Sequence, residues 1–144
     1  MGGRYSAAAA ESKTSAQSRM SGVTLDSGAL IALDRNDRRV IALLARAREI
    51  GAHITPPATA LAQAVRRPSR QARLSRLARQ PTTELVTLDR VDATRVGLLL
   101  AGRRTSDVVD AHVVICARRN AQPIVTSDPE DLAHLDPEAR LIVV

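Results

Sequence analysis

Short apolar runs alternate along the chain with stretches whose apolar residues recur at helical spacing. The runs predict strands, and the helical spacing predicts amphipathic helices between them. The predicted strands are residues 23–26, 53–55, 84–88, 123–126 and 140–144. Strands that alternate with helices are typical of a parallel sheet flanked by helices. The pattern therefore predicts an α/β fold.

Start and stop signals give the limits of the helices. Asp37 and Asp89 are suited to cap the helices that follow them, and Ser69 precedes another. Gly51 is suited to end the second helix. The predicted helices are residues 29–35, 38–50, 58–67, 70–80, 90–101, 106–118 and 129–134.

The length of 144 residues fits a single domain with one sizeable core. Residues 1–21 are rich in Ser and Ala without an apolar period, so we expect a disordered or peripheral extension before a domain at 22–144. Met20 is a candidate for the natural start. No apolar run approaches the roughly 20 residues that cross a bilayer, and no signal peptide is recognised. With a single cysteine, Cys116, these features favour a cytoplasmic protein.

The basic character of the chain adds information on its partners. The net charge is +6 and the pI is about 11.1. Of the 21 Lys and Arg residues, all except Lys13 are arginine. Arginine binds phosphate in a bidentate manner, so one interpretation is a polyanionic partner. The other is a GC-rich genome, which favours Arg and Ala codons. With one Tyr and no Phe or Trp, nucleic acid would be bound through phosphates and shape rather than by base stacking.

Arginine is most concentrated between residues 66 and 79, which contain six arginines and no acid. Five of the six recur every three residues and therefore spiral around a helix of 3.6 residues per turn. This is either a solvated helix that buries Leu74 and Leu77, or a rim that contacts phosphates. The candidate phosphate contacts, which include a basic loop after residue 101, are Arg67, Arg70, Arg73, Arg103 and Arg104.

Acids stand at the ends of several predicted elements. One pair lies three residues apart at the start of a helix and so shares one side of it. Others follow the first and fourth predicted strands. The carboxyl ends of parallel strands lie at one edge of a sheet, where such folds bind ligands, so these acids are able to converge there. They are Asp26, Asp107, Asp110, Asp128 and Asp131.

Each acid taken singly also has a structural explanation. Asp26 or Ser27 is able to cap the helix that follows, as are Asp107 and Asp128. Asp110 is a first-turn acid favoured by the helix dipole. The functional interpretation therefore depends on the arrangement as a whole.

Carboxylates that converge repel one another unless a cation lies between them. Hard oxygen ligands suit Mg²⁺ or Mn²⁺, whereas no His/Cys spacing supports zinc. Such a metal lowers the pKa of a bound water and stabilises negative charge on an attacked phosphate. Together with the arginines, the acids predict hydrolysis of a phosphodiester.

Three motifs resemble the PIN-domain family, and specifically the VapC-type toxins of bacterial toxin–antitoxin pairs. They are TLDSGALIALDR from residue 24, DVVDAHVVICA from residue 107 and VTSDPEDL from residue 125, and the resemblance spans residues 22–144. It implies a PIN-like three-layer α/β/α fold with a central, mostly parallel sheet of four to five strands. It also implies an acidic pocket holding Mg²⁺ or Mn²⁺, ribonuclease activity on RNA, a VapB-type antitoxin partner and a homodimer.

Matched by motif, the resemblance assigns Asp26, Asp110 and Asp128 as the catalytic carboxylates that hold the metal. Asp107 is expected to assist as a ligand or through a bridging water. Further residues are expected to support the site, mainly by hydrogen bonds to the carboxylates or to a metal-bound water. They are Ser27, Thr126, Ser127 and the auxiliary acid Asp131.

The chain departs from the family at Gln63, where a glutamate is usual. An amide still offers a carbonyl oxygen, but the site has one negative charge fewer, which should weaken metal binding. Two functions follow: an active toxin, or a catalytically weak PIN-domain protein that binds RNA or an antitoxin. If the motif alignment is shifted, Gln63 is only a surface residue.

The other candidates for chemistry carry weaker signals. His112 lies about 200° around the helix from Asp110, so we do not expect it to share that face. Cys116 is interpreted as a small core residue.

Overall fold

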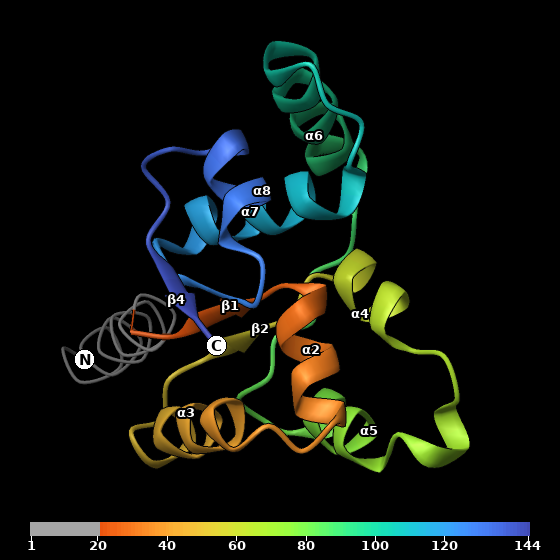
Figure 1. The fold of residues 1–144 in the computed structure, drawn as a ribbon, viewed down its shortest axis with the longest axis vertical. Coiled ribbons are helices and arrows are strands. Elements are labelled where there is room, and N and C mark those ends of the chain that lie inside the picture. The colour runs from red at the N-terminus through yellow and green to blue at the C-terminus, as the bar shows by residue number, and fades with distance from the viewer. Residues whose placement is uncertain (1–20) are drawn as a thin grey trace, which may run out of the picture.

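The structure is a computed structural model that describes residues 21–144 (Figure 1). Apart from Ser21, the predicted N-terminal extension and the candidate start at Met20 lie outside the described residues. Between residues 21 and 144, the helices are all too short or too polar to cross a membrane.

A four-stranded sheet lies at the centre, in the order β2-β1-β3-β4, and every pair of neighbours is parallel. Leu25, Ile54 and Val125, from three neighbouring strands, are fully buried. Such strands are apolar at successive positions because both faces of the sheet are covered. The predicted parallel sheet is confirmed. Its strands are β1 (Val23–Leu25), β2 (Ile54–Thr55), β3 (Ile124–Thr126) and β4 (Leu141–Val143).

Helices cover both faces of this sheet. Figure 1 shows α6, α7 and α8 on one side and α2, α3 and α5 on the other. The predicted three-layer PIN-like α/β/α class is therefore confirmed. In the described chain the helices are α2 (Ser27–Asp34), α3 (Arg38–Glu49), α4 (Ala58–Ala64), α5 (Ala72–Arg79), α6 (Arg90–Arg103), α7 (Val108–Asn120) and α8 (Pro129–Leu135).

The strand predicted at residues 84–88 is wrong. The chain there runs parallel to β2 but makes only two isolated bridges, Ile54↔Thr83 and Pro57↔Val86. Its ladder includes bonds from Ile54 N–H to Thr82 O at 3.0 Å and from Val86 N–H to Pro56 O at 3.2 Å. Pro56 stands where the ladder needs a further donor and has no N–H. The segment therefore lies along the sheet edge without becoming a regular strand.

The chain between α4 and α5 turns around the side chain of Gln71. Its Oε1 accepts hydrogen bonds from the N–H groups of Arg66 and Arg67, each at 2.9 Å. Its Nε2 donates to the carbonyl of Ala64 at 3.0 Å. These bonds satisfy backbone groups that a longer helix would have used. The predicted continuation of α4 to residue 67 is therefore wrong, and the helix ends at Ala64.

The predicted start of α5 at residue 70 is also wrong. A short 3-10 helix, η1 (Pro68–Arg70), comes first, and α5 begins only at Ala72. Ser69 therefore does not cap it. As predicted, the helix buries Leu74 and Leu77.

Gly22, just before β1, leaves no space for a side chain. A Cβ there would lie 2.0 Å from the carbonyl oxygen of His53, which accepts a hydrogen bond from Val23 N–H at 3.0 Å. We expect Gly22→Ala to force β1 and β2 apart and to lower the free energy of unfolding by about 1–3 kcal/mol. Urea denaturation measures this change.

The matched control is Gly97→Ala in α6, because no described atom lies within 4 Å of an added Cβ there. That substitution should raise the free energy of unfolding by roughly 0.5–1 kcal/mol, since alanine favours a helix over glycine. Equal effects of the two substitutions would contradict the steric argument.

Candidate active site at the carboxyl edge of the sheet

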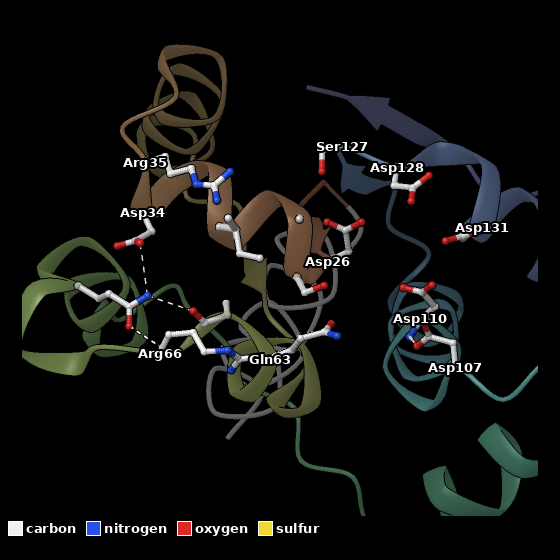
Figure 2. A pocket seen from close by; sticks show the side chains of 15 residues that line it. Asp26, Asp34, Arg35, Gln63, Arg66, Asp107, Asp110, Ser127, Asp128 and Asp131 are labelled. Carbon is white, nitrogen blue, oxygen red and sulfur yellow. Dashed lines mark hydrogen bonds between the residues drawn. The ribbon is translucent and has the colours of Figure 1, made fainter.

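An open cavity of about 650 Å³ lies at the edge of the sheet where β1 and β3 end. Figure 2 shows a group of carboxylates gathered at one end of it, while Asp34 lies apart, beside Arg35. The group comes from three separate segments: the end of β1, the start of α7 and the β3–α8 connection. Its members are Asp26, Asp107, Asp110, Asp128 and Asp131.

Asp26 is positioned by the strand before it and the helix after it. The residue is 5% exposed, and its Oδ1 accepts a hydrogen bond from Ala29 N–H at 2.7 Å, so it caps α2. Burial raises the pKa of Asp26, and the charge of Asp128 adds to the effect, although hydrogen bonds from Thr126 and Ala29 oppose it. The capping role and the place in the cavity therefore coexist in one residue.

Asp107 and Asp110 enter the cavity from the first turn of α7. Asp107 caps the helix, because its Oδ1 accepts a hydrogen bond from Asp110 N–H at 2.9 Å. The helix accordingly begins at Val108, two residues later than predicted. Burial raises the pKa of Asp110 to about 7, helped by the negative charges of Asp107, Asp131 and Asp26. This carboxyl group is the most strongly perturbed acid of the cavity.

Asp128 and Asp131 reach the cavity from the chain after β3. The backbone N–H of Asp128 donates to Thr126 Oγ1 at 2.9 Å. In the described chain its side chain makes no capping hydrogen bond to α8. The capping explanation therefore fails for Asp128, and its carboxylate is free to face the cavity beside Asp131, which belongs to the first turn of α8.

The hydroxyl groups predicted to support the site are close to Asp26 and Asp128 along the chain. Thr126 is fully buried and hydrogen-bonds Asp26, while Ser27 and Ser127 line the cavity. A Cβ on Gly28 would lie 2.3 Å from Ser127 Oγ. Glycine at this position therefore lets the start of α2 approach the β3–α8 connection closely.

Position 63, on the opposite wall of the cavity, is occupied by a glutamine and not by an acid. Gln63 is exposed on α4 and lines the cavity, so it is not merely a surface residue. Arg35 and Arg66 line the same cavity (Figure 2), and the sequence reasoning missed both. The sequence carried no signal for Arg66, because the chain leaves its helical path after Ala64.

The arginines predicted to contact RNA lie elsewhere. They are exposed, and in the described chain they do not line the cavity. The set consists of Arg67, Arg70, Arg73, Arg103 and Arg104. Their contact with RNA stays a prediction.

His112 and Cys116 face the interior rather than the cavity. Both side chains are fully buried, and neither lines the cavity among the described residues. The expectation that His112 does not share the face of Asp110 is confirmed, as is the core position of Cys116. His112 Nδ1 forms a hydrogen bond with Thr59 Oγ1 at 2.6 Å, and burial lowers the pKa of its imidazole.

The raised pKa of Asp110 predicts how the stability of the metal-free protein depends on pH. Because its pKa is about 7 in the folded chain against about 3.9 unfolded, the folded state holds an extra proton between these values. The stabilisation is complete below the unfolded pKa and is lost as pH rises through about 7. The melting temperature of metal-free protein should therefore fall between pH 5 and pH 8, measured by calorimetry with a chelator present.

The control for this pH effect is Asp110→Asn, which cannot titrate at this position. Its melting temperature should fall less over the same range. A fall as steep as that of the unaltered chain would show that other groups cause the dependence.

Comparison with known proteins supports the fold. No family model matches the chain, and no curated protein matches it. Among solved structures, the chain is similar to FitAcB from Neisseria gonorrhoeae, with a TM-score of 0.55 and 15% sequence identity. The likeness covers 83% of this chain and 96% of that chain. At this identity the match concerns the fold, a PIN-like α/β domain with a parallel sheet.

Proposed function

We propose that the chain is a metal-dependent endoribonuclease, the VapC-type toxin of a toxin–antitoxin pair, which hydrolyses RNA phosphodiester bonds. One observation carries the proposal: Asp26, Asp110 and Asp128 reach a single open cavity from three separate parts of the chain. Burial raises the pKa of both Asp26 and Asp110. Such a concentration of carboxylates destabilises the fold unless a cation compensates the charge.

Mg²⁺ or Mn²⁺ fits the chemistry of these donors. The described side chains at this end of the cavity offer carboxylate and hydroxyl oxygens, which suit hard divalent cations. Asp26, Asp110 and Asp128 would hold the ion, and Asp107 would bind it directly or through water. When bound, the ion lowers the pKa of a coordinated water and offsets negative charge on the phosphate.

The surrounding residues would fix the positions of these acids. Thr126 hydrogen-bonds Asp26 through its side chain and accepts from the N–H of Asp128, so it connects two of the three carboxylates. Ser27 and Ser127 would hydrogen-bond a carboxylate or the attacking water. Asp131 would act as an auxiliary acceptor on the same side.

The arginines would bind the substrate. Arg35 and Arg66 line the cavity away from the group of five acids, a position suited to a phosphate next to the one that is cut. The exposed arginines outside the cavity would contact the RNA backbone further along, with a net charge of +6 favouring association. These outer contacts are Arg67, Arg70, Arg73, Arg103 and Arg104.

The structural neighbour supports the biological context. FitAcB is a toxin–antitoxin complex in which FitB is a PIN-domain toxin. By analogy, this chain would be a cytoplasmic toxin held inactive by a VapB-type antitoxin, and it would form a homodimer. These partners rest on fold likeness together with the sequence motifs.

A second candidate function is a PIN-domain protein that binds RNA or an antitoxin with little or no cleavage. Gln63 favours it, because this residue lines the cavity where the family usually has a glutamate. The cavity then lacks one negative charge, which weakens its hold on a divalent cation.

The test is a nuclease assay on single-stranded and structured RNA, with Mg²⁺, Mn²⁺ or a chelator. We expect cleavage with either metal, none with the chelator, and recovery when metal is restored. Equal cleavage in the chelator would contradict the proposal. RNA binding without cleavage in either metal, unchanged in Asp26→Asn and Asp128→Asn, would favour the second candidate.

A further inference from the structure

A second group of metal-binding side chains lies away from the cavity, between α6 and α7. Asp92 of α6 and His112 and Cys116 of α7 are all fully buried. Their ligand atoms lie within 4.8 Å of one another. None of the three lines the acidic cavity among the described residues, so the group is a separate feature of the fold.

Two atoms of this group have no hydrogen-bond partner within residues 21–144: Asp92 Oδ2 and His112 Nε2. They lie 3.9 Å apart, too far for a hydrogen bond. An unsatisfied buried acceptor is costly, and a buried carboxylate more so. Both atoms carry a lone pair suited to a metal when the imidazole is neutral and protonated on Nδ1.

The geometry of α7 favours chelation. His112 and Cys116 are four residues apart, so they lie on one face of the helix with their side chains adjacent. His112 Nδ1 forms a hydrogen bond with Thr59 Oγ1 at 2.6 Å. Metal-binding histidines characteristically hold the other ring nitrogen in this way, which fixes the ring and leaves Nε2 for the metal.

We propose that Asp92, His112 and Cys116 form a binding site for a zinc-like transition metal that joins α6 to α7. Nitrogen, sulfur and oxygen donors together match Zn²⁺ rather than Mg²⁺. Zinc bonds of about 2.0–2.3 Å place neighbouring ligand atoms roughly 3.3–3.6 Å apart. The ligand atoms of Asp92, His112 and Cys116 lie up to 4.8 Å apart, so small side-chain movements are needed to bring them to these distances.

Arg119 is the competing group. It pairs with Asp92 through Oδ1, and its side chain is 38% exposed. Since the guanidinium uses one oxygen, Oδ2 stays available to a metal. The ion pair then holds the ligating carboxylate from behind, as a hydrogen-bonded partner does at many metal sites.

Cys116 supplies the thiolate. Burial, with the negative charge of Glu84, raises the pKa of Cys116 to about 12, so the thiol keeps its proton at neutral pH without a metal. Metal binding displaces this proton to solvent and forms the metal–sulfur bond. The site is independent of the nuclease proposal, although it would stabilise the helix that carries Asp107 and Asp110.

The test uses full-length protein without a polyhistidine tag, freed of metal by a chelator and titrated with Co²⁺ and then Zn²⁺. A thiolate-to-cobalt charge-transfer band is expected at about one Co²⁺ per chain, because it requires a bond to the single cysteine. Zn²⁺ should remove the band by displacement. The same titration of Asp110→Asn, which disrupts the acidic cavity, should give the same band.

Cys116→Ser should lose the band and weaken zinc binding by at least about tenfold. Thermal unfolding gives a second readout: Zn²⁺ should raise the melting temperature of the unaltered chain and of Asp110→Asn, but not that of Cys116→Ser. If the unaltered chain shows no thiolate band with excess Co²⁺, the proposal is overturned, whatever the variants do. A zinc effect that Asp110→Asn abolishes would assign the ion to the cavity and also overturn it.

Discussion

Asp110→Asn is expected to abolish metal-dependent RNA cleavage while stabilising the metal-free protein. Asp110 is the most strongly perturbed acid of the cavity, because burial raises its pKa to about 7 with the help of three neighbouring acids. Asparagine keeps the shape but removes a charged ligand. A misplaced metal should stabilise the transition state less by several kcal/mol. The value of kcat/KM should therefore fall by at least about 100-fold.

The opposite effect on stability follows from the same charges. Without metal, the amide removes the repulsion with Asp107, Asp131 and Asp26, so the melting temperature at pH 8 should rise. This is the expected trade-off at a site selected for binding rather than for stability. Steady-state cleavage in Mg²⁺ and calorimetry in a chelator measure the two effects.

Glu130→Gln is the matched control for this substitution. Glu130 is an exposed acid between Asp128 and Asp131 in the sequence, but it does not line the cavity in the described chain. Its loss should leave both cleavage and metal-free stability nearly unchanged. If Asp110→Asn cleaves as fast as the unaltered chain, Asp110 is not a metal ligand, and the nuclease proposal loses its main support.

Strands that are covered on both faces of a sheet are runs of apolar residues, and these runs made the sheet predictable from the sequence. The sequence also predicted that acids after strands would be able to meet, because strands separated by helices are parallel. It did not show that β1 and β3 are neighbours. This pairing, made over a long stretch of chain, is what brings Asp26 beside Asp128.

The predictions for residues 84–88 and for the end of α4 were wrong because a residue outside each segment changes the backbone hydrogen bonding there. Residues 84–88 have a strand's composition, but Pro56 in the neighbouring segment interrupts the ladder. The end of α4 depends on the Gln71 side chain, which reaches back to Arg66 and Arg67. Local propensity carries no information on such contacts.

The sequence did not predict the buried group of Asp92, His112 and Cys116, because this group depends on contacts between distant parts of the chain. The spacing of His112 and Cys116 is readable as one turn of a helix, but Asp92 joins them only through the packing of two helices. Arg35 and Arg66 are a similar case, since their place in the cavity depends on how α2 and α4 pack.

Gln63→Glu is expected to tighten Mg²⁺ binding and to raise the rate of RNA cleavage at subsaturating metal. The substitution adds a carboxylate to the wall of the cavity that lacks one, and affinity for a hard cation rises with the charge of its ligands. An increase of about tenfold in affinity corresponds to roughly 1.4 kcal/mol. Isothermal titration calorimetry with Mg²⁺ measures the affinity directly.

Arg66, which lines the same cavity, is able to pair with the new glutamate and to reduce its effect, so Gln63→Glu combined with Arg66→Ala should bind Mg²⁺ more tightly still. Ala62→Glu is the control, because Ala62 is exposed on the same helix but does not line the cavity within the described chain. If both glutamates raise the affinity equally, the gain comes from net charge and not from a ligand at position 63. A large gain in cleavage by Gln63→Glu alone would mean that the chain keeps a nuclease framework whose activity is held low by a single missing charge.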